Sequence, residues 1–174
     1  MTEREYTRTS LLSKKQLSLF WRLFARAWQA HCNVLATHGA IPESKDDFRH
    51  ALILKATLGK YASIKEVANP CFESLMLDMA AITGDEREIG YWTACVERRY
   101  RFLIEQALTM MQEMDCSVEY DWEYVRHIYR HSKILPLTLD EVPADHLRAV
   151  FQMVDTHRRR LKRRLRDAME EAPF

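Results

Sequence analysis

The feature that most constrains the fold is the helical spacing of apolar residues over long segments. Between residues 86 and 114, aromatic and aliphatic side chains recur every three or four positions, as at Trp92, Val96 and Tyr100. That period places them on one face of an α-helix, whereas a half-buried strand would alternate polar and apolar residues. Only 4 of the 174 residues are Gly and 5 are Pro, so few positions interrupt such helices.

Helix caps and the same spacing predict further helices. Ser13 and Gln16 have the spacing of a capping box, and Asp121 can cap a shorter helix. The predicted helices cover residues 14–38, 44–58, 70–82, 86–114, 121–131 and 143–171. Because no Asn-Gly or Asp-Gly turn separates alternating runs, we predict an all-α fold. It is a compact bundle of about six helices with a long basic C-terminal helix.

We expect three segments in chain order. Residues 1–12 are polar and form a flexible N-terminal arm, and residues 13–135 form a helical core domain. Residues 143–171 form a basic amphipathic helix that is packed on the core or projects from it. Residues 132–144, where these last two segments meet, contain two of the five prolines and two adjacent acids, which favours a joint there.

Composition favours a globular protein of the cytoplasm. Apolar residues make up 47% of the chain and charged residues 29%, which is typical of a folded domain. No apolar run approaches the roughly 20 residues that cross a bilayer, and the charged N-terminus lacks a signal-peptide core. The 4 cysteines are widely spaced and are expected to be reduced thiols. We therefore expect no interaction with a membrane.

The strongest functional signal is a run of seven cations within residues 158–166, in a chain whose formal net charge is only +1. Leu161 and Leu165 keep helical spacing with Val154, so this segment is an amphipathic basic helix. Clustered cations on a helix repel one another unless an anionic surface compensates them. We predict that the helix contacts the backbone of DNA or RNA. The contacting residues are Arg158, Arg159, Arg160, Lys162, Arg163, Arg164 and Arg166.

Two other groups of cations could extend that surface. One lies among aromatic residues of the 86–114 helix, and arginine beside aromatic rings is a combination that grips single-stranded nucleic acid. Core packing explains the same aromatics adequately and is the favoured interpretation of them. The other group lies in and after the 121–131 helix. Together the two groups comprise Arg98, Arg99, Arg101, Arg126, Arg130 and Lys133.

Alternatives to nucleic-acid binding remain open. The run could be a solvated helix end, paired with nearby acids such as Asp155, Asp167 and Glu170. Residues 101–157 contain ten acids against five Lys or Arg, so an acidic segment at 113–123 could pair with the run, within one molecule or across a homodimer. The chain could also be a protein-interaction module, an inhibitor or adaptor. Its basic helix or its aromatic first helix would then dock on a protein partner, the basic helix on an acidic surface.

Catalytic and metal chemistry have little support in the sequence. His127 and His131 stand four residues apart, a spacing that lets two imidazoles face one metal, but no third ligand accompanies them. Arg126 and Arg130 beside them would repel a divalent cation. We therefore expect a protein that is not an enzyme and that needs no cofactor or metal.

Short motifs in the first half resemble a known family. They are Ser13-Lys14-Lys15-Gln16 leading into Trp21, Arg49-His50-Ala51-Leu52, and the stretch from Thr57 to Glu66. Over residues 13–82 they resemble the GemA-type regulatory proteins of Mu-like phages, in which a similar helix start precedes a turn marked by Gly, Ser and Glu. The resemblance implies a regulatory protein of a phage or mobile element that acts in DNA metabolism. It supplies no catalytic residue.

Overall fold

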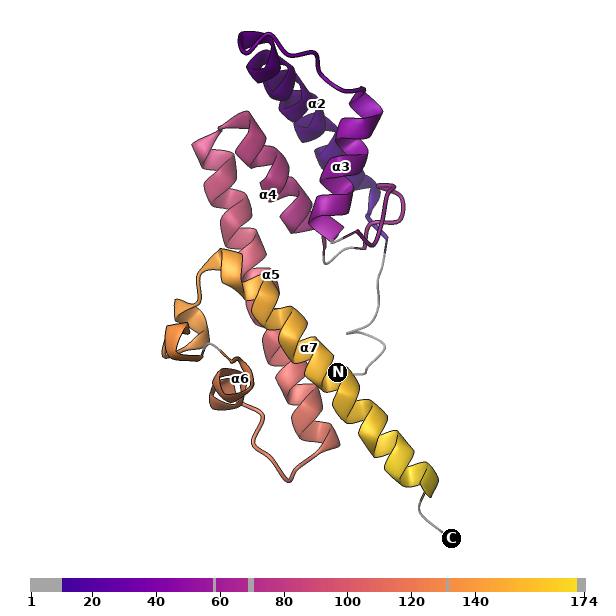
Figure 1. The fold of residues 1–174 in the computed structure, drawn as a ribbon, viewed down its shortest axis with the longest axis vertical. Coiled ribbons are helices and arrows are strands. Elements are labelled where there is room, and N and C mark those ends of the chain that lie inside the picture. The colour runs from indigo at the N-terminus through magenta and orange to yellow at the C-terminus, as the bar shows by residue number, and fades with distance from the viewer. Residues whose placement is uncertain (1–10, 58, 69–70, 131, 172–174) are drawn as a thin grey trace. The chain divides into compact units, whose positions relative to one another are not determined.

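The computed structural model describes residues 11–57, 59–68, 71–130 and 132–171, and most of them are helical (Figure 1). Two short 3-10 helices, η2 (Ser132–Ile134) and η3 (Leu139–Glu141), lie between the last two α-helices. The described residues form no strand, only an isolated bridge between Leu11 and Ala68. The predicted all-α fold with six helices, the last of them long, is confirmed. The helices are α2 (Lys14–Thr37), α3 (Lys45–Thr57), α4 (Phe72–Thr83), α5 (Glu86–Met114), α6 (Trp122–Ile128) and α7 (Ala144–Glu171).

Side-chain caps fix several helix ends. Ser13 Oγ accepts a hydrogen bond from the Gln16 backbone N–H at 3.3 Å, and Gln16 Oε1 accepts one from the Ser13 N–H at 2.9 Å. This is the predicted capping box of α2. Asp121 caps α6 by accepting from the Tyr124 N–H at 2.9 Å. Gly84 ends α4 with φ of 69°, a left-handed conformation that glycine adopts without steric cost.

Parts of three predictions fall beyond what the structure describes. Residues 1–10 of the predicted arm lie outside the described residues, whereas Leu12 is buried in the core. The Asn69-Pro70 start predicted for α4 also lies outside the described residues, as does His131.

Contacts divide the chain into two compact units, and the division falls within α5, between Val96 and Glu97. The described parts of the two units are residues 11–96 and 97–171. This division differs from the boundary expected after residue 135. The apolar face of α5 continues through Trp92, Val96 and Tyr100, so its periodicity carries no sign of the division.

The core of residues 11–96 is built on the aromatic face of α2. Phe20 and Phe24 are almost fully buried, and the ring centroid of Phe24 lies 5.9 Å from that of Phe48 on α3. Burying one such side chain contributes about 1.5–3 kcal/mol. Trp21, which belongs to the same sequence stripe, is instead 44% exposed, and the Arg49 guanidinium lies 5.7 Å from its ring centroid.

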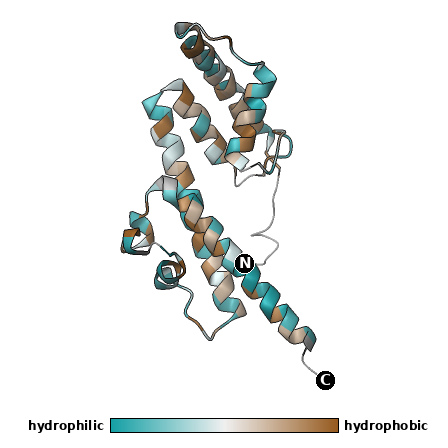
Figure 2. Ribbon diagram, viewed as in Figure 1, coloured by the Kyte–Doolittle hydropathy of each residue, from teal (hydrophilic) through white to brown (hydrophobic). Residues whose placement is uncertain are grey.

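The core of residues 97–171 joins α5, α6 and α7. Ile104, Val125 and Leu147, one from each helix, are fully buried. The ring centroids of Tyr100 and Phe151 lie 5.9 Å apart and connect α5 to α7. Apolar residues are frequent in the N-terminal half of α7, whereas its C-terminal half is mostly hydrophilic (Figure 2).

Candidate nucleic-acid interface

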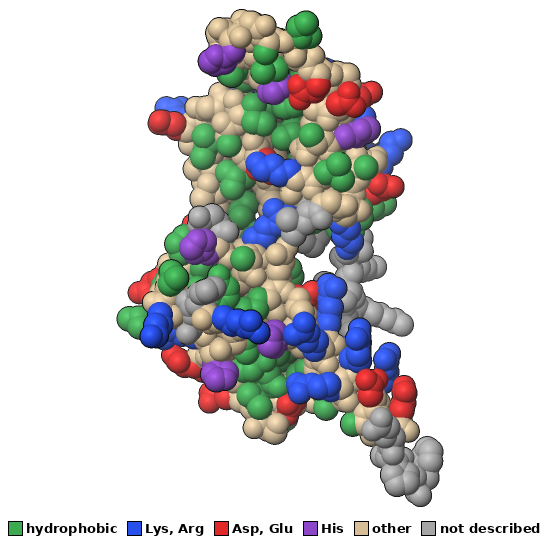
Figure 3. Space-filling model, viewed as in Figure 1, with side chains coloured by type: hydrophobic (Ala, Val, Ile, Leu, Met, Phe, Trp, Pro, Cys, Tyr) green, Lys and Arg blue, Asp and Glu red, His purple; other side chains and the backbone are tan. Residues whose placement is uncertain are grey.

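The basic half of α7 is held by a narrow apolar stripe and presents cations on its other sides. Val154 and Leu161 in that stripe are buried, whereas the cations from residue 159 to residue 166 are exposed. At about 100° per residue, one group of cations lies roughly 100–160° from Leu161 around the helix. We call this group the outer face, and Figure 3 shows Lys and Arg side chains gathered along this part of α7. The outer face comprises Arg159, Lys162, Arg163 and Arg166.

Arg160 and Arg164 lie on the other side of the helix from the outer face. They are about 100° and 60° from Leu161 in the opposite direction. Both are exposed, and both are close enough to His157 to affect its protonation.

Arg158 does not belong to the exposed surface, and the prediction that it contacts phosphate is wrong. Its side chain is only 5% exposed. Its Nε and Nη2 atoms donate to Asp155 Oδ1 at 3.0 and 2.9 Å. Asp155 is also buried, and its Oδ2 lies 2.6 Å from Arg159 Nη2. Arg158 therefore lies on the buried side of α7, while Arg159 extends from the same carboxylate toward solvent.

The three arginines predicted on α5 do not form one surface. At about 100° per residue, Arg98 and Arg101 lie about 60° apart around α5, whereas Arg99 lies about 160° from Arg101. Arg101 donates through Nη1 to the carbonyl oxygen of Leu139 and through Nη2 to that of Val142 at 3.2 Å. Arg101 therefore stabilises the segment before α7, which corrects its predicted role as a phosphate contact.

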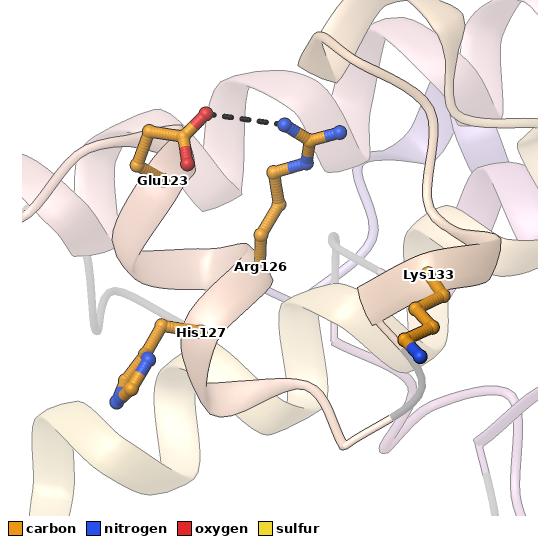
Figure 4. Close-up of a pocket in the computed structure, with 4 residues that line it drawn as sticks. All are labelled: Glu123, Arg126, His127 and Lys133. Atoms are coloured by element: carbon orange, nitrogen blue, oxygen red, sulfur yellow. Dashed lines mark hydrogen bonds and ion pairs between the residues drawn. The ribbon is translucent and has the colours of Figure 1, made fainter.

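The structure does bring Arg126 and Lys133 together. They line a cavity of about 320 Å³ with Glu123 and His127 (Figure 4). Arg126 Nη1 lies 3.1 Å from Glu123 Oε1. The described residues contain no group of three or more His, Cys, Asp or Glu that could hold a metal ion.

Asp115, in the acidic segment that could pair with the basic run, has hydrogen-bond partners within that segment. Asp115 accepts hydrogen bonds from the hydroxyls of Ser117 at 2.5 Å and Tyr120 at 2.9 Å. The bonds from Ser117, then the one from Tyr120 and the charge of Arg164, lower the pKa of Asp115. Burial, with the bond to Asp115, raises the pKa of Tyr120 to about 12. The charge of Arg164, a cation of the run, thus acts on this cluster.

His157 lies on the same side of α7 as Arg160 and Arg164. The Tyr124 hydroxyl lies 3.3 Å from His157 Nδ1. Burial, followed by the charges of Arg160 and Arg164, lowers the pKa of His157. The folded protein therefore favours the neutral imidazole, which can accept a hydrogen bond from Tyr124.

Because the folded chain favours the neutral form of His157, its stability should depend on pH. The unfolded chain binds the proton at the ordinary histidine pKa of 6.5, and the folded chain binds it only at lower pH. The contribution of His157 to the free energy of unfolding should therefore be fully present above pH 6.5. It should decrease as the pH falls from 6.5 toward the lower pKa of His157 in the folded chain. Urea unfolding between about pH 7.5 and 5 measures this, and His157→Gln should flatten the profile. His50→Gln, at an exposed histidine, is the control, and equal slopes in both variants would contradict the assignment.

No known protein-family model matches this chain, and comparisons with curated proteins and with solved structures find no match either. The resemblance of residues 13–82 to GemA-type proteins stays a prediction. No described helix is both long and apolar enough to span a membrane.

Proposed function

We propose that this chain is a non-enzymatic accessory protein that binds the phosphate backbone of nucleic acid through the outer face of α7. The observation that carries the proposal is the row of exposed cations from Arg159 to Arg166 on a helix held in place by its buried stripe. At about 1.5 Å per residue, this row spans about 10 Å. Duplex DNA presents roughly six phosphate charges over that length.

Neighbouring acids offer only weak competition for Arg166 of the outer face. Arg166 lies 3.4 Å from Asp167 and 3.7 Å from Glu170, and all three side chains are about half exposed or more. Exposed ion pairs of this kind contribute about 0–1 kcal/mol, so a phosphate can replace the carboxylates. This supports binding over the alternative of a solvated helix end.

The side chains of the outer face suit the phosphate backbone, and the one base that they can pair with in the major groove is guanine. Residues 159–166 contain only Arg, Lys and Leu. They offer no Asn or Gln, the side chains that pair with adenine in the major groove. If the resemblance of residues 13–82 holds, this binding serves regulation of DNA metabolism in a phage or mobile element, in the cytoplasm of its host.

Salt dependence tests the proposal. If the four outer-face cations each contact one phosphate, log K should fall against log salt with a slope of about −3.6 on duplex DNA and about −2.8 on single strands. Fluorescence anisotropy with labelled duplex DNA, single-stranded DNA and RNA measures it. Absence of binding at low salt would reject the proposal and direct attention to an acidic protein surface as the partner of α7.

A further inference from the structure

The cavity beside α6 has the chemistry of an anion site that is separate from the outer face of α7. Its described lining contains two cationic side chains, one imidazole and one carboxylate. Figure 4 shows Arg126 extending from α6 toward Glu123, Lys133 on the neighbouring η2, and His127 projecting from α6 on another side. Arg126 and Lys133 line the same pocket from two different elements, so a ligand in it can contact both.

The lining residues have unused capacity to donate hydrogen bonds. A guanidinium carries five N–H groups, and Arg126 directs Nη1 to Glu123. Within the described residues, Lys133 and His127 form no ion pair. Lys133 offers three further N–H donors, and His127 offers at least one.

The occupant that fits this set is a phosphate with one ester bond. Such a group carries about −1.5 to −2 charges at pH 7 and three strong acceptor oxygens, which require more than one cation. The arginine fork binds two of those oxygens and lysine acts as a point charge on the third. A phosphodiester carries one charge and has two free oxygens, so it engages fewer of the donors that line this pocket.

We infer that Arg126 and Lys133 form a binding site for a phosphomonoester, with His127 as a donor at its edge. The inference does not depend on nucleic-acid binding by α7. A phosphomonoester could come from the 5′ end of a nucleic-acid strand or from a free nucleotide, and the chemistry of the cavity is the same for both.

In the absence of a ligand, the Glu123 carboxylate is paired with Arg126. Its side chain is 75% exposed, so its pair with Arg126 is weak and a phosphate can displace it. While it remains in the cavity, its charge repels the phosphate. Glu123→Gln should therefore strengthen phosphate binding by about fivefold, the effect of removing one unit charge at a short distance in a largely aqueous setting. A residue with only a structural role would not produce a gain.

The test uses the full chain and two matched pairs of probes. One pair is a nucleoside 5′-monophosphate and the same nucleoside with a 5′-hydroxyl. The other is a short single-stranded oligonucleotide with and without a 5′-phosphate. We expect the phosphorylated member of at least one pair to bind at least fivefold more tightly, and the pair that responds identifies the source of the phosphate. Glu123→Gln should widen the difference, and Arg126→Gln and Lys133→Gln should each reduce it.

Two results would overturn the inference. One is an equal affinity for both members of both pairs. The other is a preference for phosphate that Glu123→Gln leaves unchanged. Because Glu123 is on the surface, its variant is expected to fold, and circular dichroism checks this. Binding of the hydroxyl oligonucleotide and its salt dependence report on α7 separately, so failure of the cavity site is distinguishable from failure of the proposed function.

Discussion

Reversing three charges of the outer face, with Lys162→Glu, Arg163→Glu and Arg166→Glu in one variant, should weaken binding to duplex DNA by at least about 100-fold at low salt. An exposed cation about 4 Å from a phosphate gains about 1 kcal/mol in water, so three lost contacts remove about 3 kcal/mol. The new carboxylates add repulsion. The slope of log K against log salt should also shrink in magnitude by about 2.7, the counterion release of three contacts. Fluorescence anisotropy measures both quantities.

A variant with the same change in net charge separates the role of α7 from that of overall charge. Lys14, Lys15 and Lys65 are exposed and lie in the other unit. Their replacement by Glu should preserve the fold, because acids in the first turn of α2 suit the helix dipole. We expect this control to bind nearly as well as the original chain. If it loses affinity as strongly as the α7 variant, overall charge governs binding and the outer face is not the interface.

Local patterns predict most of the helices because their signals lie close together in the sequence. The predicted segment 86–114 coincides with α5 (Glu86–Met114), and the cap at Ser13 begins α2 as expected. The division within α5 could not be predicted in this way. It depends on which helices pack against each half of α5, and the spacing of apolar residues along one helix does not contain that information.

The residues of the candidate site also divide into those that local sequence patterns could identify and those that depend on the fold. The cations of α7 could be found from composition, and spacing could have excluded Arg158, which follows Val154 by four residues and precedes Leu161 by three. Arg101 is different, because its carbonyl partners lie 38 and 41 residues away in the sequence. The sequence grouped Arg126 with Lys133, but their meeting in one pocket depends on how η2 folds back toward α6, which local spacing does not give.

Removing the buried carboxylate of α7 should cause the largest loss of stability. We expect Asp155→Ala to lower the free energy of unfolding by about 3–5 kcal/mol, because it leaves the Arg158 guanidinium buried without its counter-charge. The side chains of Asp155 and Arg158 are only 10% and 5% exposed, so water cannot readily replace the lost bonds. Urea unfolding followed by circular dichroism measures the change. Arg159→Ala should cost less than about 1 kcal/mol, because the side chain of Arg159 is 74% exposed.

A double variant tests whether the unpaired charge, and not the loss of packing alone, is the cause. Combining Asp155→Leu with Arg158→Met replaces both charged groups by apolar side chains, which is often neutral or stabilising at buried ion pairs. We therefore expect the double variant to recover most of the stability that Asp155→Ala loses. If it is as unstable as Asp155→Ala, the pair matters through its shape or its other contacts. Because the outer face remains intact in the double variant, its affinity for duplex DNA should stay close to that of the original chain, which separates the anchoring of α7 from its binding surface.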